Sequence, residues 1–295
     1  MTRRATAQRP RRTRIGFHVS IADGLPKAVD RALERGCTAF QIFCASPRAW
    51  AWSERSADEI EEFKRARKDA GLDPLVVHAC YLINPCSADR TVRRRSVPRL
   101  RQELRLAARL GADFYVLHPG SAKGQPVERL VERAAESIRR AVEGLSAPPA
   151  LLLEGTATPH GPGGDLTHLG ELVARLHDSV PEARAGIALD SCHAFAAGWD
   201  LTRAEQVDRL ARDVRQAVGK AGLQLLHVND ARDPAGSFRD RHEHIGKGLI
   251  GRRGLGNLLA HSAFADLPLI LETPWETIEQ DRRNLRAVLD ILGEP

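Results

Sequence analysis

Residues 114–154 read FYVLHPGSAKGQPVERLVERAAESIRRAVEGLSAPPALLLE, and this stretch contains the pattern that decides the fold. Phe114–Leu117 and Ala150–Leu153 are short apolar runs, whereas Val127–Leu145 carries apolar residues at helical spacing. Apolar runs without polar alternation are typical of parallel strands that are buried on both faces. We therefore interpret the stretch as a strand, a crossover helix and a second parallel strand.

The same pattern recurs on both sides of this stretch. The predicted strands are Arg14–Val19, Ala39–Phe43, Leu75–Val77, Phe114–Leu117, Ala150–Leu153, Ile187–Leu189, Leu223–Val228 and Leu267–Leu271. The helices that follow them are Pro26–Arg35, Ala57–Ala70, Arg93–Leu110, Val127–Leu145, Leu166–His177, Arg203–Val218, Arg252–His261 and Ile278–Leu292. Eight such units predict an α/β protein with a single (β/α)8 TIM barrel. An open doubly wound sheet is the alternative, but no Gly-x-Gly-x-x-Gly follows the first strand.

Length and composition agree with one globular domain. The chain has 295 residues, of which 42% are hydrophobic and 28% charged, and a barrel of this size needs no second domain. No apolar run reaches the ~18 residues of a membrane helix, and no apolar segment of a secretory signal follows the first arginines. Five cysteines without a CxxC pair predict free thiols in a reducing cytoplasm.

The net charge of +6 belongs to the N-terminus. The first fourteen residues contain six arginines and no acid, and the remaining residues carry 38 basic and 38 acidic side chains. We expect residues 1–14 to be a disordered basic tail and residues 15–295 to form the barrel domain. The tail could contact nucleic acid or could be a solvated extension. If residues 15–295 bind nucleic acid, this binding therefore depends on particular residues and not on net charge.

Six of the predicted strands run directly into a histidine or an acidic residue. These residues are His78, His118, Glu154, Asp190, His227 and Glu272. The carboxyl ends of barrel strands meet at the rim that carries active sites. One such residue alone is most simply a satisfied polar side chain. Six of them on one rim need compensation, because desolvation and like charges oppose their convergence, and bound cations supply it.

Three further residues of the same types follow these strands. His193 lies three residues after Asp190, and Asp240 and His242 lie two residues apart in the loop after the seventh strand. The full set has five imidazoles and four carboxylates, more than one ion can use, so we expect three divalent ions. Nitrogen and oxygen ligands without thiolate favour zinc, with manganese as the second choice, and Cys192 is interpreted as a packing residue. About two positive charges would remain, which suits a phosphodiester.

The motifs around these ligands resemble those of endonuclease IV, the metal-dependent apurinic/apyrimidinic (AP) endonuclease family. The most specific matches are Asp190-Ser-Cys-His-Ala-Phe-Ala-Ala-Gly-Trp-Asp200, His227-Val-Asn-Asp-Ala231, Gly236-Ser-Phe-Arg-Asp-Arg-His242 and His118-Pro-Gly-Ser121. The resemblance extends from Gly16 to Thr273, nearly the whole chain after the tail.

The resemblance implies a role for each ligand, with Glu154 bridging two ions. His78 and His118 would complete the first site, Asp190, His227 and Glu272 the second, and His193, Asp240 and His242 the third. It further implies that Glu154 and Glu272 are catalytic, that a hydroxide bridging the first two ions attacks phosphorus 5′ to an AP site in double-stranded DNA, and that the third ion stabilises the departing 3′-oxygen. The products would be a 3′-hydroxyl and a 5′-deoxyribose phosphate, and 3′-end trimming is expected too.

The resemblance also implies contacts with the damaged DNA by a monomeric enzyme. Arg48 and Tyr81 would insert into the base stack beside the lesion, and Asn84 would lie at the same surface. Wedging the stack offsets the free energy of flipping the abasic sugar, which is smallest where no base must be unpaired. Taken without the resemblance, Tyr81 is better explained as a packed loop aromatic.

The loop Ala157–Asp165 and three single positions depart from the family pattern. Gly155 replaces an asparagine after the bridging glutamate, Lys247 replaces a glutamate between two glycines, and Cys80 replaces another small residue. None is a predicted ligand. We expect them to affect metal preference and lesion range.

The third helix region is rich in arginine. Its basic residues are Arg90, Arg93, Arg94, Arg95, Arg99, Arg101, Arg105 and Arg109, with Asp89 and Glu103 as the acids. This pattern is typical of a phosphate-contacting face or of a solvated helix face, and the sequence does not decide between them.

Two other functions compete with the repair endonuclease. A metal-dependent sugar isomerase or epimerase would share the barrel and the strand-end ligands, but not the extra trio of His193, Asp240 and His242. A catalytically silent DNA- or metal-binding protein would be expected to have lost ligands. His18, at the end of the first strand, is expected to line the pocket.

Overall fold

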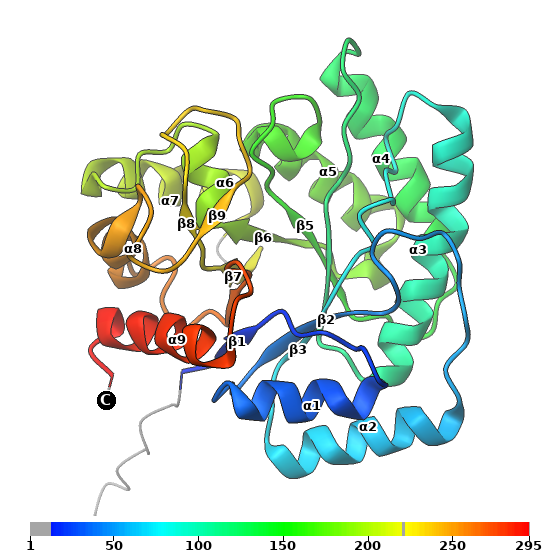
Figure 1. Ribbon diagram of the computed structural model, residues 1–295. Coiled ribbons are helices and arrows are strands. Elements are labelled where there is room, and N and C mark those ends of the chain that lie inside the picture. Colours follow the sequence, from blue (N-terminus) through cyan, green and yellow to red (C-terminus); the bar gives the residue numbers. More distant parts are fainter. Residues whose placement is uncertain (1–12, 220–221, 295) are drawn as a thin grey trace, which may run out of the picture.

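Eight parallel strands form one sheet in the computed structural model, which describes residues 13–219 and 222–294 (Figure 1). The strands are β1 (Ile15–Phe17), β2 (Phe40–Phe43), β3 (Leu75–His78), β4 (Phe114–Leu117), β5 (Ala150–Glu154), β6 (Gly186–Asp190), β7 (Leu223–His227) and β10 (Leu269–Leu271). Their order is β1-β10-β7-β6-β5-β4-β3-β2. A bridge between His18 and Gln41, and a hydrogen bond from Thr38 N to Ile15 O (2.7 Å), join β1 to β2. The predicted TIM barrel is confirmed, and most of the predicted tail lies outside the described residues.

Helices surround the barrel in the described chain. They are α1 (Leu25–Glu34), α2 (Ala57–Ala70), α3 (Arg90–Leu110), α4 (Val127–Val142), α5 (Leu166–Ser179), α7 (Ala204–Val218), α8 (Gly251–Ala260) and α9 (Ile278–Leu292), with short 3-10 turns η1 (Pro162–Gly164) and η2 (Pro181–Ala183). None of the described helices is long and apolar enough to cross a membrane.

Two helix ends differ from the prediction by about three residues, for local reasons. The helix α3 begins three residues early, because the Asp89 side chain caps it by accepting from Thr91 N (2.6 Å). The helix α4 ends at Val142, because Glu143 leaves the helical conformation and Gly144 has a positive φ of 71°.

Three short elements at the rim were not predicted. The helix α6 (Ser191–Ala196) follows β6 directly, and its first turn is capped by Asp190, whose Oδ1 accepts from His193 N (2.9 Å). The strands β8 (Asp230–Ala231) and β9 (His242–Glu243) pair in an antiparallel ribbon above the barrel. Both α6 and the ribbon carry predicted metal ligands.

The barrel interior is filled by one layer of apolar side chains. Its members are Ala39, Val76, Val116, Leu152, Ala188, Leu225 and Ile270. The first strand contributes Gly16, where a Cβ atom would lie 1.7 Å from Ala39 O, so only glycine allows β1 and β2 to approach this closely. A larger apolar cluster packs the outer face of the sheet against the helices.

Candidate active site

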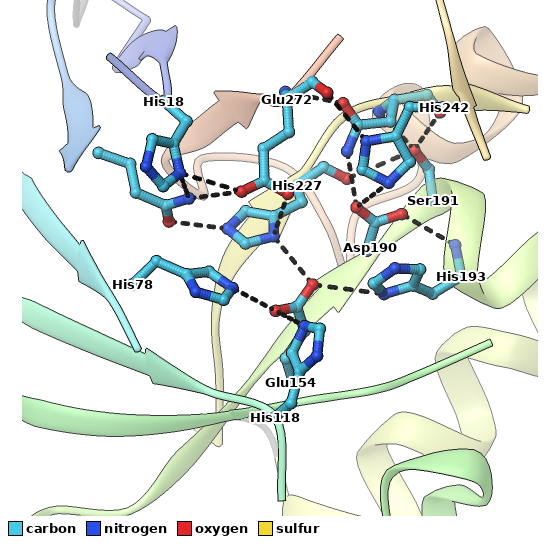
Figure 2. A network of polar contacts seen from close by, with 12 residues as sticks. His18, His78, His118, Glu154, Asp190, Ser191, His193, His227, His242 and Glu272 are labelled. Carbon is cyan, nitrogen blue, oxygen red and sulfur yellow. Dashed lines mark hydrogen bonds and ion pairs between the residues drawn. The ribbon is translucent and has the colours of Figure 1, made fainter. Parts of the chain in front are cut away.

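A second layer, entirely polar, lies directly above the apolar layer. Side chains alternate between the two faces of a strand, so a residue two positions after an interior residue also points inward. The polar layer contains one residue for each strand, namely His18, Gln41, His78, His118, Glu154, Asp190, His227 and Glu272. Figure 2 shows their side chains converging. The six predicted strand-end residues are thus brought together, His18 lines the site as expected, and Gln41 was not predicted.

Glu154 lies at the centre of the site and is fully buried. Its Oε2 is 3.3 Å from His78 Nε2 and 2.9 Å from His118 Nε2, and its Oε1 is 3.0 Å from His227 Nδ1. Burial alone would raise the pKa of the Glu154 carboxyl, but the imidazoles of His227 and His118 lower this pKa well below its usual value. Glu154 is therefore an ionised carboxylate that reaches both halves of the cluster.

Most of the imidazoles are oriented by a backbone carbonyl. His78 Nδ1 is 2.8 Å from Ala79 O, His193 Nδ1 is 2.9 Å from Gly155 O, and His242 Nδ1 is 2.9 Å from Glu272 O. We assign the N–H to Nδ1 in these rings, which leaves Nε2 as the ligand atom. The contact with His193 is made by the backbone carbonyl of residue 155, so a glycine at this position is compatible with the orientation of the His193 ring.

His227 is oriented in the opposite sense by Gln41. His227 Nε2 is 3.0 Å from Gln41 Oε1, so its Nδ1 faces Glu154. Gln41 also donates from Nε2 to Glu272 Oε1 (2.6 Å) and lies 2.9 Å from His18 Nδ1. Gln41 thus orients one imidazole ligand, His227, and one carboxylate ligand, Glu272.

The remaining predicted ligands come from loops. His193 lies on α6, Asp240 precedes β9 and His242 begins β9. His193 Nε2 is 3.2 Å from Asp240 Oδ2, and His242 Nε2 is 3.2 Å from Asp240 Oδ1. Burial opposes the charging of His242, but Asp190 and Asp240 raise its pKa to about 9. Asp240 and His242, two residues apart in the chain, thus face each other in the structure.

Four groups of possible metal ligands lie in the described part of the chain, and the ligand atoms of each group are within 4.8 Å of one another. The groups are His78, His118 and Glu154; Glu154, Asp190, His227 and Glu272; Asp190, His193 and His242; and Cys192, Asp240 and His242. His242 Nε2 is buried and faces the Asp240 and Asp190 carboxylates at 3.2 and 3.8 Å without the geometry of a hydrogen bond, so this atom is available to a metal ion. The nitrogen and oxygen donors fit zinc or manganese.

Cys192 belongs to one of these groups, although we interpreted it as a packing residue. Its side chain is fully buried next to the loop-borne ligands. Burial and the nearby Asp190 carboxylate raise the pKa of the Cys192 thiol to about 12. The thiol is therefore neutral in this structure and lies beside the oxygen and nitrogen ligands.

Three residues that the sequence did not single out support the rim. Asn229 donates from Nδ2 to Asp190 Oδ2 (2.6 Å) and accepts from Glu272 N (2.8 Å), and Ser191 Oγ donates to Asn229 O (2.6 Å). The buried Asp230 carboxylate accepts backbone N–H groups from residues 246, 248, 250 and 251, which fixes the loop around Lys247. Asn229 and Asp230 belong to the motif His227–Ala231, which was the available signal.

The predicted DNA-contacting residues lie in two neighbouring loops. Arg48 is exposed in the loop after β2, and Tyr81 is 57% exposed in the loop after β3. Asn84 is half-buried, donates from Nδ2 to Ser121 O (2.9 Å) and accepts from Ser121 N (3.3 Å). Asn84 thus joins the loops that follow β3 and β4.

The arginine-rich helix α3 does not present all its arginines on one exposed face. Arg99 is only 2% exposed and pairs with Glu103, so neither the phosphate-contacting nor the solvated interpretation holds for it. Arg93 donates to Ser87 O, and Arg101 donates to Glu143 O (2.8 Å). Several of these arginines therefore join segments of the protein to one another.

Comparison with known proteins places the chain among related barrels. The family model described as xylose isomerase-like TIM barrel matches residues 29–293. A probable endonuclease 4 from Methanoculleus marisnigri is 39% identical over 284 residues, which are 95% of this chain and 99% of the relative. The crystal structure of endonuclease IV from Thermus thermophilus has a TM-score of 0.83 and 38% identity, covering 96% of this chain and all of that one.

A sugar-converting enzyme shares the architecture at greater distance. The 3-keto-D-glucoside 4-epimerase from E. coli has a TM-score of 0.64 with 16% identity over 95% of this chain. Such a likeness establishes the barrel alone.

Proposed function

This chain belongs to the endonuclease IV family within the xylose isomerase-like TIM barrels, and on that premise we propose that it is a metal-dependent DNA-repair endonuclease. It hydrolyses the phosphodiester 5′ to AP sites, leaves a 3′-hydroxyl and a 5′-deoxyribose phosphate, and trims blocked 3′ ends. The observation that carries the proposal is the convergence of eight imidazoles and carboxylates around Glu154 at the barrel rim.

Three divalent ions are proposed as cofactors, with zinc favoured over manganese. Glu154 is shared by two sites; His78 and His118 complete the first, Asp190, His227 and Glu272 the second, and His193, Asp240 and His242 hold the third. Support comes from the ligand groups and from imidazole rings whose second nitrogen is already tied to a carbonyl or to Gln41.

The protein contributes ionised carboxylates and oriented ligands to the hydrolysis. When bound, the divalent ions polarise the phosphoryl oxygens and lower the pKa of water. Glu154 and Glu272 remain ionised in a buried site, because neighbouring imidazoles, His227 above all, lower the pKa values of both carboxyl groups against the effect of burial. Four carboxylates then leave the loaded site positive enough to attract a phosphodiester.

The substrate is proposed to be double-stranded DNA that carries an AP site. Arg48 and Tyr81 are exposed residues of adjacent loops, and the Tyr81 ring lies 5.8 Å from that of His78, where the two side chains would wedge the stack while the abasic sugar enters the site. Asn84 would act at the same surface, where it already orders the two loops around Ser121. A monomer presents this rim without further subunits.

The isomerase alternative accounts for less of the site. Strand-end ligands alone would serve a sugar enzyme, but the trio on α6 and the β8–β9 ribbon brings further metal-binding groups to the same cavity. A third ion is an advantage for a departing alkoxide and gives no evident benefit to an isomerisation.

The decisive experiment uses a duplex oligonucleotide with one abasic-site analogue, and metal analysis of the same sample. Incision on the 5′ side with a 3′-hydroxyl and about three ions per chain is the expected result. Turnover of aldoses or ketoses by the metal-loaded protein, without DNA incision, would instead establish the isomerase. A preparation without metal is reconstituted with zinc or manganese before the assay.

A further inference from the structure

We propose that Arg99 and Glu103 are positioning residues that hold the two DNA-inserting loops, residues 44–56 after β2 and residues 79–89 after β3, as one unit. The proposal rests on the proposed function and concerns residues of α3 that the nuclease site does not use. It assigns a role to the arginine-rich helix that differs from both interpretations of its sequence.

The two residues form an ion pair inside the protein. They are one helical turn apart on α3, Arg99 Nε lies 2.6 Å from Glu103 Oε1, and the exposed fractions are 2% and 1%. An ion pair that is removed from water contributes little net stability, because desolvation offsets the attraction. The role of the pair is therefore inferred from the other hydrogen bonds that Arg99 and Glu103 make.

Arg99 holds the first loop. Its Nη1 donates to Ala51 O (2.8 Å), and its guanidinium lies 4.9 Å from the ring centroid of Trp52. Arg95, one turn earlier on α3, lies 4.6 Å from the ring centroid of Trp50. The segment that follows Arg48 is thus fixed on α3 by a hydrogen bond and two cation–π contacts.

Glu103 holds the second loop. Its Oε2 accepts from Cys80 N (3.1 Å) and from Tyr115 OH (2.7 Å). Cys80 immediately precedes Tyr81, so the backbone that carries Tyr81 is tied to the same ion pair. The tyrosine hydroxyl connects the carboxylate to β4, which makes the support rigid.

The loops also contact each other beside the inserting residues. Tyr81 N donates to Pro47 O (3.2 Å), and Cys80 Sγ lies 3.1 Å from the same oxygen. Pro47 immediately precedes Arg48. The backbone neighbours of both inserting side chains therefore belong to one connected network that ends in the Arg99–Glu103 pair.

The loops that carry Arg48 and Tyr81 must keep their conformation while these side chains separate stacked bases. Loops that are ordered before binding lose less conformational entropy when DNA binds, and support by packed side chains holds them in the productive geometry. Loss of the pair is therefore expected to weaken DNA engagement and to leave the chemical step of bound substrate nearly unchanged.

The test uses the metal-loaded full chain with the double substitution Arg99→Met and Glu103→Gln, which removes both charges while keeping similar side-chain volumes. We expect KM for abasic duplex DNA to rise about 10- to 100-fold, with kcat at saturating DNA and metal content close to wild type. Hydrogen exchange followed by mass spectrometry is expected to accelerate in residues 46–52 and in residues 79–84 together.

Arg105→Met is the matched control, because Arg105 lies on the same helix, is exposed and carries the same charge. Arg99→Lys keeps a cation beside Glu103, so its KM is expected to lie between those of the wild type and of the double variant. It replaces the double variant if that protein does not fold. An unchanged KM in a folded variant, an equal rise in Arg105→Met, or faster exchange in one loop only would overturn the proposal. Failure of the wild-type chain to incise abasic DNA would instead refute the proposed function.

Discussion

The strand-borne and loop-borne ligands reach the same cavity by different means. Glu154, His227 and Asp190 end strands, and their side chains are fully buried above a filled apolar layer. Asp240 lies in a loop, and its side chain is 49% exposed although it contacts two imidazoles. These three strand-borne side chains thus form a dry part of the site, whereas Asp240 lies where water can enter. We expect the two parts to hold metal unequally.

The largest effect is expected from the centre of the strand-borne part. Glu154→Gln removes the charge that faces His118 and His227, so incision should fall about 1,000-fold and the metal content should drop. Steady-state incision and metal analysis measure both quantities. Glu182→Gln, an exposed change on η2 at the other end of the barrel, is the control. Full activity of the Glu154 variant would exclude the bridging role.

A smaller effect is expected from the loop-borne part. Asp240→Asn should lower incision about 100-fold and release close to one ion per chain, because the strand-end groups remain intact. Metal analysis and the melting temperature of the loaded protein distinguish this loss from unfolding. Loss of all metal would show that the two parts are not independent.

Chelation offers a comparison without substitution. Because Asp240 is half exposed and Glu154 is not, a chelator should remove one ion from the loop-borne part first and the others more slowly. Time-resolved metal release is expected to show two phases, with the fast phase abolished in Asp240→Asn. A single phase in the wild-type protein would contradict the difference in access.

The pH dependence of the metal-free protein is expected to be the smallest effect. Nearby carboxylates, against the effect of burial, raise the pKa of His227 and of His242 to about 9. A pKa raised in the folded state stabilises the protein fully below the ordinary value near 6.5, and this contribution is lost as the pH rises through 9. Both groups should contribute to stability in this pH range, so thermal unfolding should occur at lower temperature at about pH 9.5 than at about pH 6.5. Zinc should remove this dependence, and a flat profile without metal would contradict it.

The strand-borne ligands were predictable because each follows an uninterrupted apolar run. Gln41 was missed for the opposite reason, since β2 continues to Phe43 and hides an inward-facing residue in the middle of a run. The helix α6 has six residues, too few for helical periodicity to show, and β8 and β9 have two residues each. Short elements of this kind depend on tertiary contacts, as with the Asp190 cap of α6.

The composition of helix α3 did not predict that two of its charged residues are buried. The spacing of Arg99 and Glu103 by four residues is visible in the sequence and indicates an ion pair. Its burial depends on two loops from elsewhere in the chain that fold over α3, and a local pattern does not contain this information. The motifs with functional residues were more informative, since His227–Ala231 also held the supporting Asn229 and Asp230.

The alternation that places a polar layer two residues above an apolar one restricts how such a chain can evolve. Deletion of Leu153 alone would move Glu154, the last residue of β5, into the position that faces the helices. Descendants of this chain can therefore exchange residues within the strands and vary the length of the loops. Insertions or deletions of a single residue within a strand should be eliminated by selection.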